Sequence, residues 1–478
     1  MNAGMDFFVR QQIGHLALLL VAASCTHSGP PPASASASAR PPLEARIEGL
    51  RKDALASRGA IEFVRAITED VGARAAGSPS YDEAVAWAEK RLVAEGFTGV
   101  HRESVRVTHW ERGPASAAII SSEKRVPLDL LALGGSGGTA KGGIDAEVVR
   151  VESLAAAQAL GEKDLAGKIL FLDVSTPRER DGSGYGRAVP ARTHGPRVAA
   201  ERGATGFIVR SISPDPSVPH TGSTLYDGIA SIAVSGTSAD LLRDALNRDP
   251  KAKVHLDVQV RNLPTVENYN VVGDIRGKER PDEIVLLGAH LDSWDVGRGA
   301  ADDGAGCAIM TEAARLIAKY QPRRTVRVVL FAAEETTASG GKAYAQAHEA
   351  DASRYVLAME ADTGEGRPYG LRAHVAPNRR PLVDRVVGFL SPLGIQALPG
   401  DEDSAGDDVD PLHDNGVPIF GIYQDMSRYY DIHHTERDVF EHIDQAALVE
   451  ATAAYAVAAY AAAEFDDDLG RVTAAKSR

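Results

Sequence analysis

Cysteine, basic charge and long apolar runs are all scarce in this sequence. Only Cys25 and Cys307 occur among 478 residues, which argues against a disulfide-stabilised scaffold. Lys and Arg total 52 against 66 Asp and Glu, so the net charge is −14 and no basic stripe is available to bind nucleic acid. Beyond the N-terminal segment we find no uninterrupted apolar run of about 18 residues, so we expect no membrane-spanning helix there.

What the sequence does contain is typical of a folded, exported protein. Its length and a hydrophobic fraction of 44% indicate a globular chain with two folded domains and additional segments. Residues 1–25 form a targeting segment in which the apolar run LALLLVAAS leads directly into Cys25, an arrangement similar to a bacterial lipoprotein box. We therefore predict either a periplasmic or outer-membrane lipoprotein tethered through lipidated Cys25, or a plain secreted protein. Cytoplasmic residence is the third, less favoured alternative.

The rest of the chain divides into segments of different character. Residues 26–42 are a Pro/Ala/Ser linker, residues 43–126 and 260–470 form the main predicted domain, and residues 127–259 form a small inserted α/β domain. In the first part, residues 80–96 predict an amphipathic helix that starts with a capping box of Ser80 and Glu83. In the insert, residues 196–204 predict one clear helix among short strands. We expect the insert to act as a lid or docking domain.

The second half of the main domain predicts a doubly wound, mostly parallel α/β sheet. Apolar runs that suit strands buried on both faces alternate with helical segments, which is typical of this architecture. The predicted strands are residues 268–275, 283–289, 325–333, 355–361 and 417–423, and the helices are residues 307–320, 381–391 and about 444–464. Sheets of this kind place their functional sites beyond the carboxyl ends of the strands.

Polar residues follow four of these strands where such a site should lie. They are His290, Asp292, Glu334, Glu335, Asp362 and the pair His433 and His434. Two histidines and three carboxylates suit two zinc ions, each with its own histidine and carboxylate and with one carboxylate shared. Two metals about 3.5–4 Å apart hold and activate a water, and a spare glutamate then serves as general base.

The motifs resemble those of the co-catalytic zinc exopeptidases, and most closely the carboxypeptidase Q group. These motifs are H-x-D at His290, D-D-G-A-G at Asp302, an E-E pair, a later E-x-D, and H-T-x-x-D. The resemblance covers nearly all of the chain from about residue 44. It implies that residues 127–259 are an inserted protease-associated domain.

The resemblance also implies a role for each site residue. The implied zinc ligands are His290 and Asp362 for one ion, Glu335 and His434 for the other, and Asp302 as the bridge. Glu334 is implied as the general base that takes a proton from the water between the metals. Asp292 is implied to hydrogen-bond the His290 ring and fix its tautomer.

Several further assignments rest on the same resemblance. His434 is preferred to His433 because only His434 has the H-T-x-x-D spacing, and Asp302 is preferred to Asp303 on the same basis. The segment GDDVDPL resembles the family stretch G-S-D-H-x-P-F and makes Asp408 a supporting acid. Asp295 is interpreted as a turn acid. His220, in the insert, is left unassigned.

The sequence thus predicts an exported di-zinc exopeptidase that removes N-terminal residues from peptides or splits dipeptides. Peptides or dipeptides are the expected partners, and a homodimer is compatible with the sequence. One alternative is a non-catalytic, receptor-like binding protein on the same scaffold. Another is a zinc amidohydrolase or cyclising transferase acting on a non-peptide substrate.

Overall fold

The structure is a computed structural model that describes residues 40–121 and 125–473. The predicted targeting segment, Cys25 and nearly all of the linker therefore lie outside the described residues. The longer α-helices are α1 (Leu43–Ala56), α2 (Gly59–Asp70), α3 (Pro79–Ala94), α5 (Ser183–Glu201), α6 (Gly236–Arg248), α7 (Ala305–Ala318), α9 (Ser339–Ala347), α10 (Arg380–Leu390) and α12 (Gln445–Glu464). The short ones are α4 (Leu154–Gln158), α8 (Glu334–Thr337) and α11 (Asp410–Asp414).

The strands join in one 14-stranded mixed sheet, in the order β13-β12-β14-β11-β9-β10-β8-β4-β5-β6-β7-β3, with β1 paired to β8 and β2 to β1. The strands are β1 (Thr98–Ile120), β2 (Arg125–Leu128), β3 (Leu130–Ala132), β4 (Ile144–Val151), β5 (Ile169–Leu172), β6 (Gly206–Arg210), β7 (Ala230–Val234), β8 (Lys253–Ile275), β9 (Arg280–His290), β10 (Arg324–Phe331), β11 (Tyr355–Glu360), β12 (Pro368–His374), β13 (Gln396–Ala397) and β14 (Ile419–Gln424). Neighbours among β14, β11, β9 and β10 are parallel. Their carboxyl ends therefore meet at one edge.

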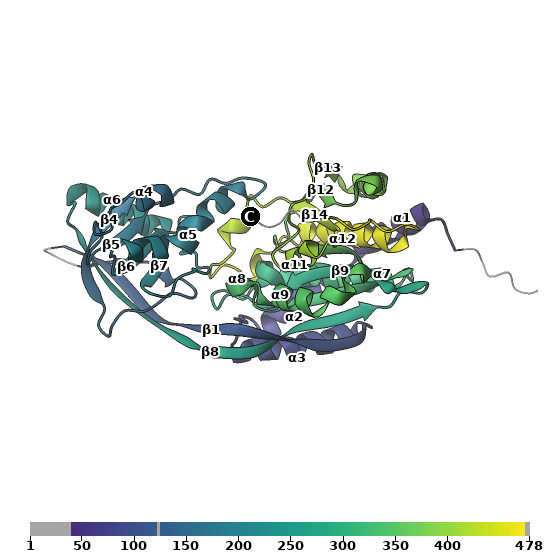
Figure 1. Ribbon diagram of the computed structural model, residues 1–478, viewed down its shortest axis with the longest axis horizontal. Helices are drawn as coiled ribbons and strands as arrows, with labels where there is room; N and C mark the ends of the chain where they lie inside the picture. Colours follow the sequence, from purple (N-terminus) through teal and green to yellow (C-terminus); the bar gives the residue numbers. More distant parts are fainter. Residues whose placement is uncertain (1–39, 122–124, 474–478) are drawn as a thin grey trace, which may run out of the picture. The chain divides into compact units, whose positions relative to one another are not determined.

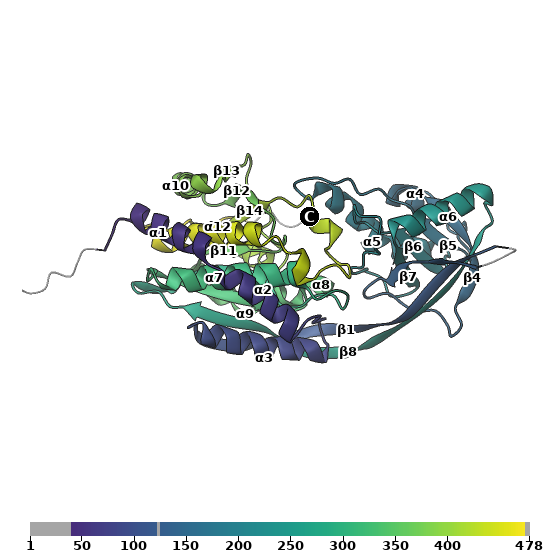
Figure 2. The same ribbon diagram turned by 180° about the vertical axis from the view of Figure 1, so that it is seen from behind.

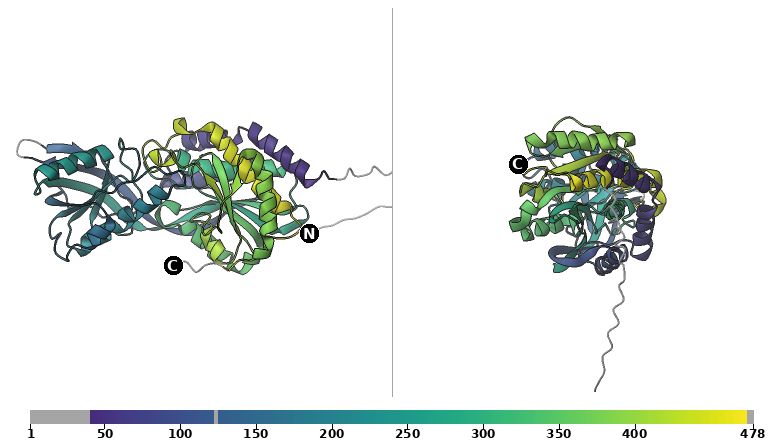
Figure 3. Two further views of the ribbon diagram at one scale, coloured as in Figure 1. Left: turned by 90° about the horizontal axis from the view of Figure 1, so that it is seen from above. Right: turned by 90° about the vertical axis from the view of Figure 1, so that its right-hand side faces the viewer.

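Helices cover both faces of these central strands, as the sequence predicts. Along β9, Val285 and Leu287 belong to the core that contains α1, α7 and α12, whereas Ile284 and Leu286 belong to a second core with α9 and α11. Figures 1 and 2 show α1 and α12 side by side, and Figure 3 shows them on one side of the strands. The α/β fold with a mostly parallel central sheet is thus confirmed.

Helix α12 bears on the expectation that no membrane-spanning helix follows the N-terminal segment. By length and composition alone it could cross a membrane, with a mean hydropathy of 1.4 over its most apolar window. However, 83% of that window is buried inside the protein. Asp444 caps its first turn by accepting hydrogen bonds from the Ala446 and Ala447 amides at 3.0 and 3.1 Å. The helix is a core element whose alanines allow close packing.

The long strands β1 and β8 carry the chain between two sets of hydrophobic clusters. Val105 of β1 and Val271 of β8 pack in the main core, whereas Ile119 and Leu256, farther along the same strands, pack in a separate cluster with β4 to β7 (Figure 1). Strand β8 passes residue 259 without a break. The division at residues 127 and 259 into two domains stays a prediction.

Two helix boundaries differ from those predicted. Helix α3 starts at Pro79, and its cap is Ser78, whose hydroxyl accepts from the Tyr81 amide at 3.2 Å, so the predicted capping box is wrong by two residues. Proline at the first helical position needs no amide partner. Helix α5 begins at Ser183 and contains two prolines, whereas the sequence predicts a start at residue 196. Proline normally ends a helix, which explains the error.

Candidate active site

His290 is the last residue of β9 and is fully buried. Its Nδ1 lies 3.0 Å from the backbone oxygen of Asp292 and 3.7 Å from a carboxylate oxygen of the same residue. Asp292 is also fully buried, and its Oδ1 accepts from the Glu334 amide at 3.1 Å. Asp292 therefore ties the end of β9 to the start of α8. The Nδ1 contact leaves Nε2 of His290 facing the carboxylates of Asp302 and Asp362.

The loop that carries Asp302 is held by two buried residues: Arg74, which the sequence analysis did not single out, and Asp438, the aspartate of the H-T-x-x-D motif. Arg74 is fully buried and donates to the backbone oxygens of Leu291 and Gly299 at 2.5 and 2.9 Å. Asp438 accepts from the Ala301 and Asp302 amides at 2.6 and 3.2 Å. Burial raises the pKa of Asp438 to about 7.

Asp303, the residue after Asp302, has a structural role. Its carboxylate accepts from the His290 amide at 3.1 Å and from the Gly306 amide at 2.9 Å, and it is fully buried. These bonds tie the start of α7 to the end of β9. Cys307 lies beside them as a buried free thiol, and burial raises the pKa of that thiol.

Glu334 and Glu335 begin α8, directly after β10. Ala333 precedes them in the left-handed region, with φ of 58°, which turns the chain sharply out of the sheet. The Glu335 side chain is 3% exposed and that of Glu334 is 15% exposed. The turn therefore points one carboxylate inward and leaves the other open to the cavity.

The remaining predicted ligands come from two other elements. Asp362 lies two residues beyond β11, and its side chain is 25% exposed. His434 lies in a turn after β14, with φ of 58°. Its backbone oxygen accepts from the Thr221 amide at 2.9 Å, and Thr221 belongs to the segment between β6 and β7. This turn is thus held in part by residues 127–259.

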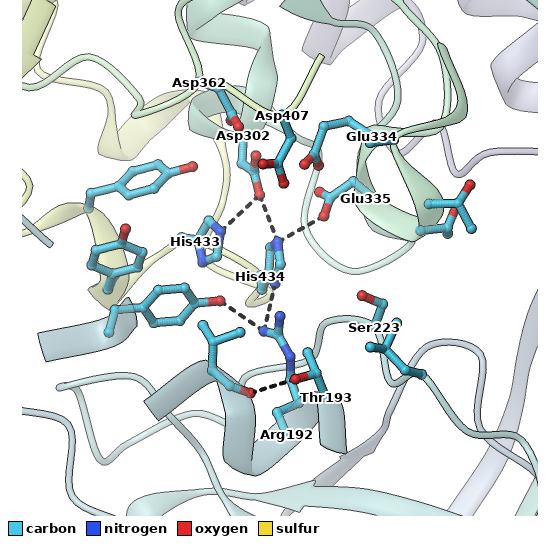
Figure 4. Close-up of a pocket in the computed structure, with 18 of the residues that line it drawn as sticks. Arg192, Thr193, Ser223, Asp302, Glu334, Glu335, Asp362, Asp407, His433 and His434 are labelled. Carbon is cyan, nitrogen blue, oxygen red and sulfur yellow. Dashed lines mark hydrogen bonds and ion pairs between the residues drawn. The ribbon is translucent and has the colours of Figure 1, made fainter. Parts of the chain in front are cut away.

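The five predicted metal ligands converge on one another, and Figure 4 shows four of them: Asp302, Glu335, Asp362 and His434. Nε2 of His290 is 3.2 Å from Oδ1 of Asp302 and 3.2 Å from Oδ1 of Asp362. Nε2 of His434 is 3.1 Å from Oδ2 of Asp302 and 2.9 Å from Oε2 of Glu335. Asp302 therefore offers one oxygen to each histidine, and the set divides into two groups that share it.

The electrostatics of this cluster are unfavourable for a chain without a cation. Burial raises the pKa of Glu334 and of Glu335 well above its ordinary value, and the nearby charges of Asp362 and Asp302 raise them further. Burial opposes the charged form of His290, but the surrounding carboxylates, Asp362 first among them, raise its pKa well above the ordinary value. A divalent cation would relieve this repulsion.

All of the predicted site residues named above except His290 and Asp292 line a cavity of about 580 Å³. The main sheet supplies one wall, which includes Glu334, Glu335, Asp362 and Asp407. Helix α5 and the segment that follows β6 supply the opposite wall, which includes Arg192, Thr193 and Ser223 (Figure 4). Residues of the predicted insert therefore form part of the site itself.

Two histidines beside the predicted ligands also belong to this site. His433 stacks on His434 with ring centroids 3.6 Å apart, and its Nε2 lies 3.5 Å from Oδ2 of Asp302. Nε2 of His220 lies 3.2 Å from Nδ1 of His433. Burial lowers the pKa of both His220 and His433 well below the ordinary value, so both rings are neutral. The sequence feature that pointed to His220 is the motif PHTG, in which it lies.

Two of the other acids noted in the sequence make structural contacts, and a third lines the cavity. Asp408 is fully buried and accepts from the Gly341 amide at 2.9 Å, which fixes the first turn of α9. Asp295 forms an ion pair with Arg112 of β1 at 2.7 Å and lies outside the group of converging ligands. Asp407, at a position where the sequence departs from the family stretch, lines the cavity.

Comparison with known proteins agrees with this geometry. Residues 270–459 match the model of Peptidase family M28. Carboxypeptidase Q of Mus musculus is 34% identical over 413 residues, which are 85% of this chain and 86% of that protein. Carboxypeptidase Q of Homo sapiens is 34% identical over 419 residues, or 86% of each chain.

Solved structures give the same result. A peptidase M28 precursor from Shewanella amazonensis is 40% identical with a TM-score of 0.87, covering 89% of this chain and 98% of that one. A zinc aminopeptidase from Bacillus subtilis shares the fold at 18% identity, with a TM-score of 0.62 and 87% and 97% of the two chains covered. The chain therefore belongs to peptidase family M28, as a metallopeptidase similar to carboxypeptidase Q.

Proposed function

We propose that this protein is a di-zinc exopeptidase that hydrolyses N-terminal peptide bonds or dipeptides. The observation that carries the proposal is the position of Asp302, whose two carboxylate oxygens lie 3.2 Å from His290 and 3.1 Å from His434. A carboxylate shared in this way between two histidine sites is what a pair of metal ions requires.

The residues present fit two zinc ions. Imidazole nitrogens and carboxylate oxygens are usual zinc donors, and His290, Asp302 and Glu335 each offer an atom within 4.8 Å of the others. The buried Oε1 of Glu335 has no hydrogen-bond partner among the described residues, which leaves it free for a ligand. His290 and Asp362 would hold one ion and Glu335 and His434 the other, with Asp302 between them. When bound, the zinc pair would lower the pKa of a water and polarise the scissile carbonyl.

Glu334 has the position expected of the general base. It lines the cavity, and its Oε2 lies 4.0 Å from Nε2 of His290, outside direct hydrogen-bond contact. The backbone of Glu334 is fixed through its amide bond to Asp292. Glu334 would take a proton from the attacking water and pass it to the leaving amine. The tie to Asp292 fixes the backbone from which this carboxylate projects.

Recognition of a free amino terminus is supported by an acid on the same wall. Asp407 lines the cavity beside Glu334 and is not a proposed zinc ligand, so its carboxylate would pair with an α-ammonium group. An N-acylated peptide carries no such charge. We therefore expect hydrolysis to require a free N-terminus.

The test is a substrate panel combined with zinc analysis of the purified protein. Unblocked dipeptides, aminoacyl amides and N-acetylated peptides are assayed side by side. Hydrolysis of free-amino substrates by protein with two zinc ions per chain supports the proposal. No zinc would indicate a receptor-like binding protein, and intact zinc with no turnover of any free-amino peptide would indicate an amidohydrolase or cyclising transferase.

We further propose that the enzyme is exported, on the pattern of residues 1–25, and that residues 127–259 are a protease-associated domain. The separate hydrophobic clusters formed by β4 to β7 support the second point. Metabolic labelling with a lipid precursor, compared between the wild type and Cys25→Ala, would decide whether Cys25 is lipidated. A label that persists in the variant would exclude this cysteine.

A further inference from the structure

A second cavity, of about 250 Å³, lies beside the candidate metal centre. Most of its lining comes from the loop before α3, the middle of β1, the segment after β9 and the start of α8. Glu335 and Thr336 line both this cavity and the reaction cavity. The proposed hydrolysis does not use the second cavity, although one of the proposed zinc ligands forms part of its wall.

The walls of the second cavity are aromatic. Of the three tryptophans in the chain, Trp110 and Trp294 line it. Trp294 is 6% exposed, and its ring packs so closely on Gly134 that a Cβ there would lie 2.0 Å from it. The same ring meets the His434 ring edge-on, with centroids 5.7 Å apart. Close packing on both sides therefore fixes the position of this wall.

Two polar atoms in the lining are buried without partners. Nε1 of Trp294 and Oγ1 of Thr336 have no hydrogen-bond partner among the residues that the structure describes. Nε1 of Trp110, by contrast, donates to the Ser136 backbone oxygen at 3.1 Å. An indole N–H can only donate, and a buried donor without an acceptor costs free energy. A ligand that carries an acceptor would remove this cost.

The charged side chains in the lining are paired within the protein. The pairs are Arg112 with Asp295, Glu111 with Arg261, and Glu335 with His434. Burial lowers the pKa of His109, so this ring is neutral as well. Because these charges are already compensated, the cavity suits a neutral ligand better than an ion. Aromatic walls with a few polar atoms that orient the ligand are typical of sites for small molecules.

We propose that the second cavity binds a neutral, planar aromatic group that carries a hydrogen-bond acceptor. A cavity of about 150 Å³ holds benzene, so the volume of about 250 Å³ accommodates a group of two fused rings. The tryptophan rings would contact the group, and Nε1 of Trp294 would donate to its acceptor. The group is either a free small molecule or an aromatic side chain of a bound peptide.

The test measures the binding of quinoline and naphthalene to the purified protein by isothermal titration calorimetry. The two molecules have nearly the same shape, but only quinoline has a ring nitrogen that accepts a hydrogen bond. We expect one quinoline per chain, bound about fivefold more tightly than naphthalene, since one hydrogen bond contributes a ratio of this size. Equal affinities, or no saturable binding of either molecule, would overturn the proposal. This comparison on the wild type does not require any variant to fold.

Variants of the three tryptophans place the bound molecule. Trp294→Phe keeps an aromatic ring but removes Nε1, so it should make the two affinities equal. Trp110→Ala should weaken the binding of both molecules about tenfold, because one aromatic wall is lost. Trp87→Phe is the matched control, because Trp87 packs on Phe63 outside the cavity lining, and it should change neither affinity. A preference for quinoline that persists in Trp294→Phe would overturn the assignment.

A competition experiment identifies the source of the aromatic group. Glu334→Gln protein is titrated with tyrosyl-alanine, alanyl-tyrosine and alanyl-alanine, with and without saturating quinoline. If the cavity takes a peptide side chain, quinoline should weaken the binding of a tyrosine-containing dipeptide and leave that of alanyl-alanine unchanged. If it takes a free molecule, quinoline should affect all three dipeptides equally. Failure of every dipeptide to bind would count against the proposed exopeptidase function, whereas the quinoline measurement decides this proposal by itself.

Discussion

The two halves of the candidate metal centre are built in different ways. His290 ends a buried strand, and its ring bonds to the backbone two residues away at 3.0 Å, so the main sheet alone positions it. His434 lies in a turn with φ of 58°, and contacts from the segment between residues 185 and 221 support that turn. One half of the site therefore belongs to the sheet, and the other depends on a distant part of the chain.

This difference changes the interpretation of residues 127–259. A lid or docking domain could be removed without altering the metal ligands themselves. Here Thr221 donates to the backbone of His434, and His220 contacts His433. We infer that this segment helps to position the second histidine and contributes to the substrate cavity.

The largest expected effect is the loss of catalytic rate when the proposed general base, Glu334, is replaced. Glu334→Gln should lower kcat by about 10²- to 10⁴-fold, the usual contribution of a general base. Zinc content should stay near that of the wild type, because Glu334 is proposed as the base and not as one of the five metal ligands, and glutamine keeps its size. Steady-state kinetics and metal analysis on the same preparation measure both. Loss of zinc would instead show that the roles of Glu334 and Glu335 are exchanged.

The next prediction concerns the two histidines directly. We expect His290→Ala to lower the free energy of unfolding by about 2–4 kcal/mol, because it leaves a cavity and unpaired polar groups in a fully buried place. His434→Ala, in a turn at the edge of the cavity, should cost about 1 kcal/mol. Urea denaturation of the zinc-free proteins measures the difference. Equal losses would remove the contrast between the two halves.

A smaller effect is expected at Asp438, which holds the Asp302 loop. Asp438→Asn should cost about 1 kcal/mol of stability and weaken zinc binding, because one of its two backbone amide bonds to Ala301 and Asp302 is lost. Glu436→Gln, at an exposed position in the same turn, is the matched control. The competition of each protein with a zinc chelator gives the affinity. Identical zinc affinities in the two variants would exclude this supporting role.

The smallest effect is expected at His220. The neutral rings allow Nε2 of His220 to donate to Nδ1 of His433, whose own Nε2 then faces Asp302. His220→Ala should lower kcat/KM by about threefold, the equivalent of one hydrogen bond between neutral groups, and leave two zinc ions in place. His194→Ala, exposed on α5, serves as the control. If both variants behave alike, residues 127–259 contribute no function through His220.

The sequence predicts the sheet-built half of the site better than the other half. Apolar runs mark β9, β10 and β11, and residues at the end of a parallel strand must lie at one edge, so His290, Glu335 and Asp362 could be grouped. Arg74, Arg192 and His220 could not, because their partners lie far away in sequence. His434, for example, is 242 positions from Arg192. No local periodicity encodes such contacts.

Native mass spectrometry of the purified, active protein tests the di-zinc assignment most directly. The wild type should carry two zinc ions per chain, and Asp302→Ala should lose both together, because that carboxylate is shared by both positions. A fully active wild type that carries one zinc ion or none would contradict the assignment. So would an Asp302→Ala protein that retains both ions.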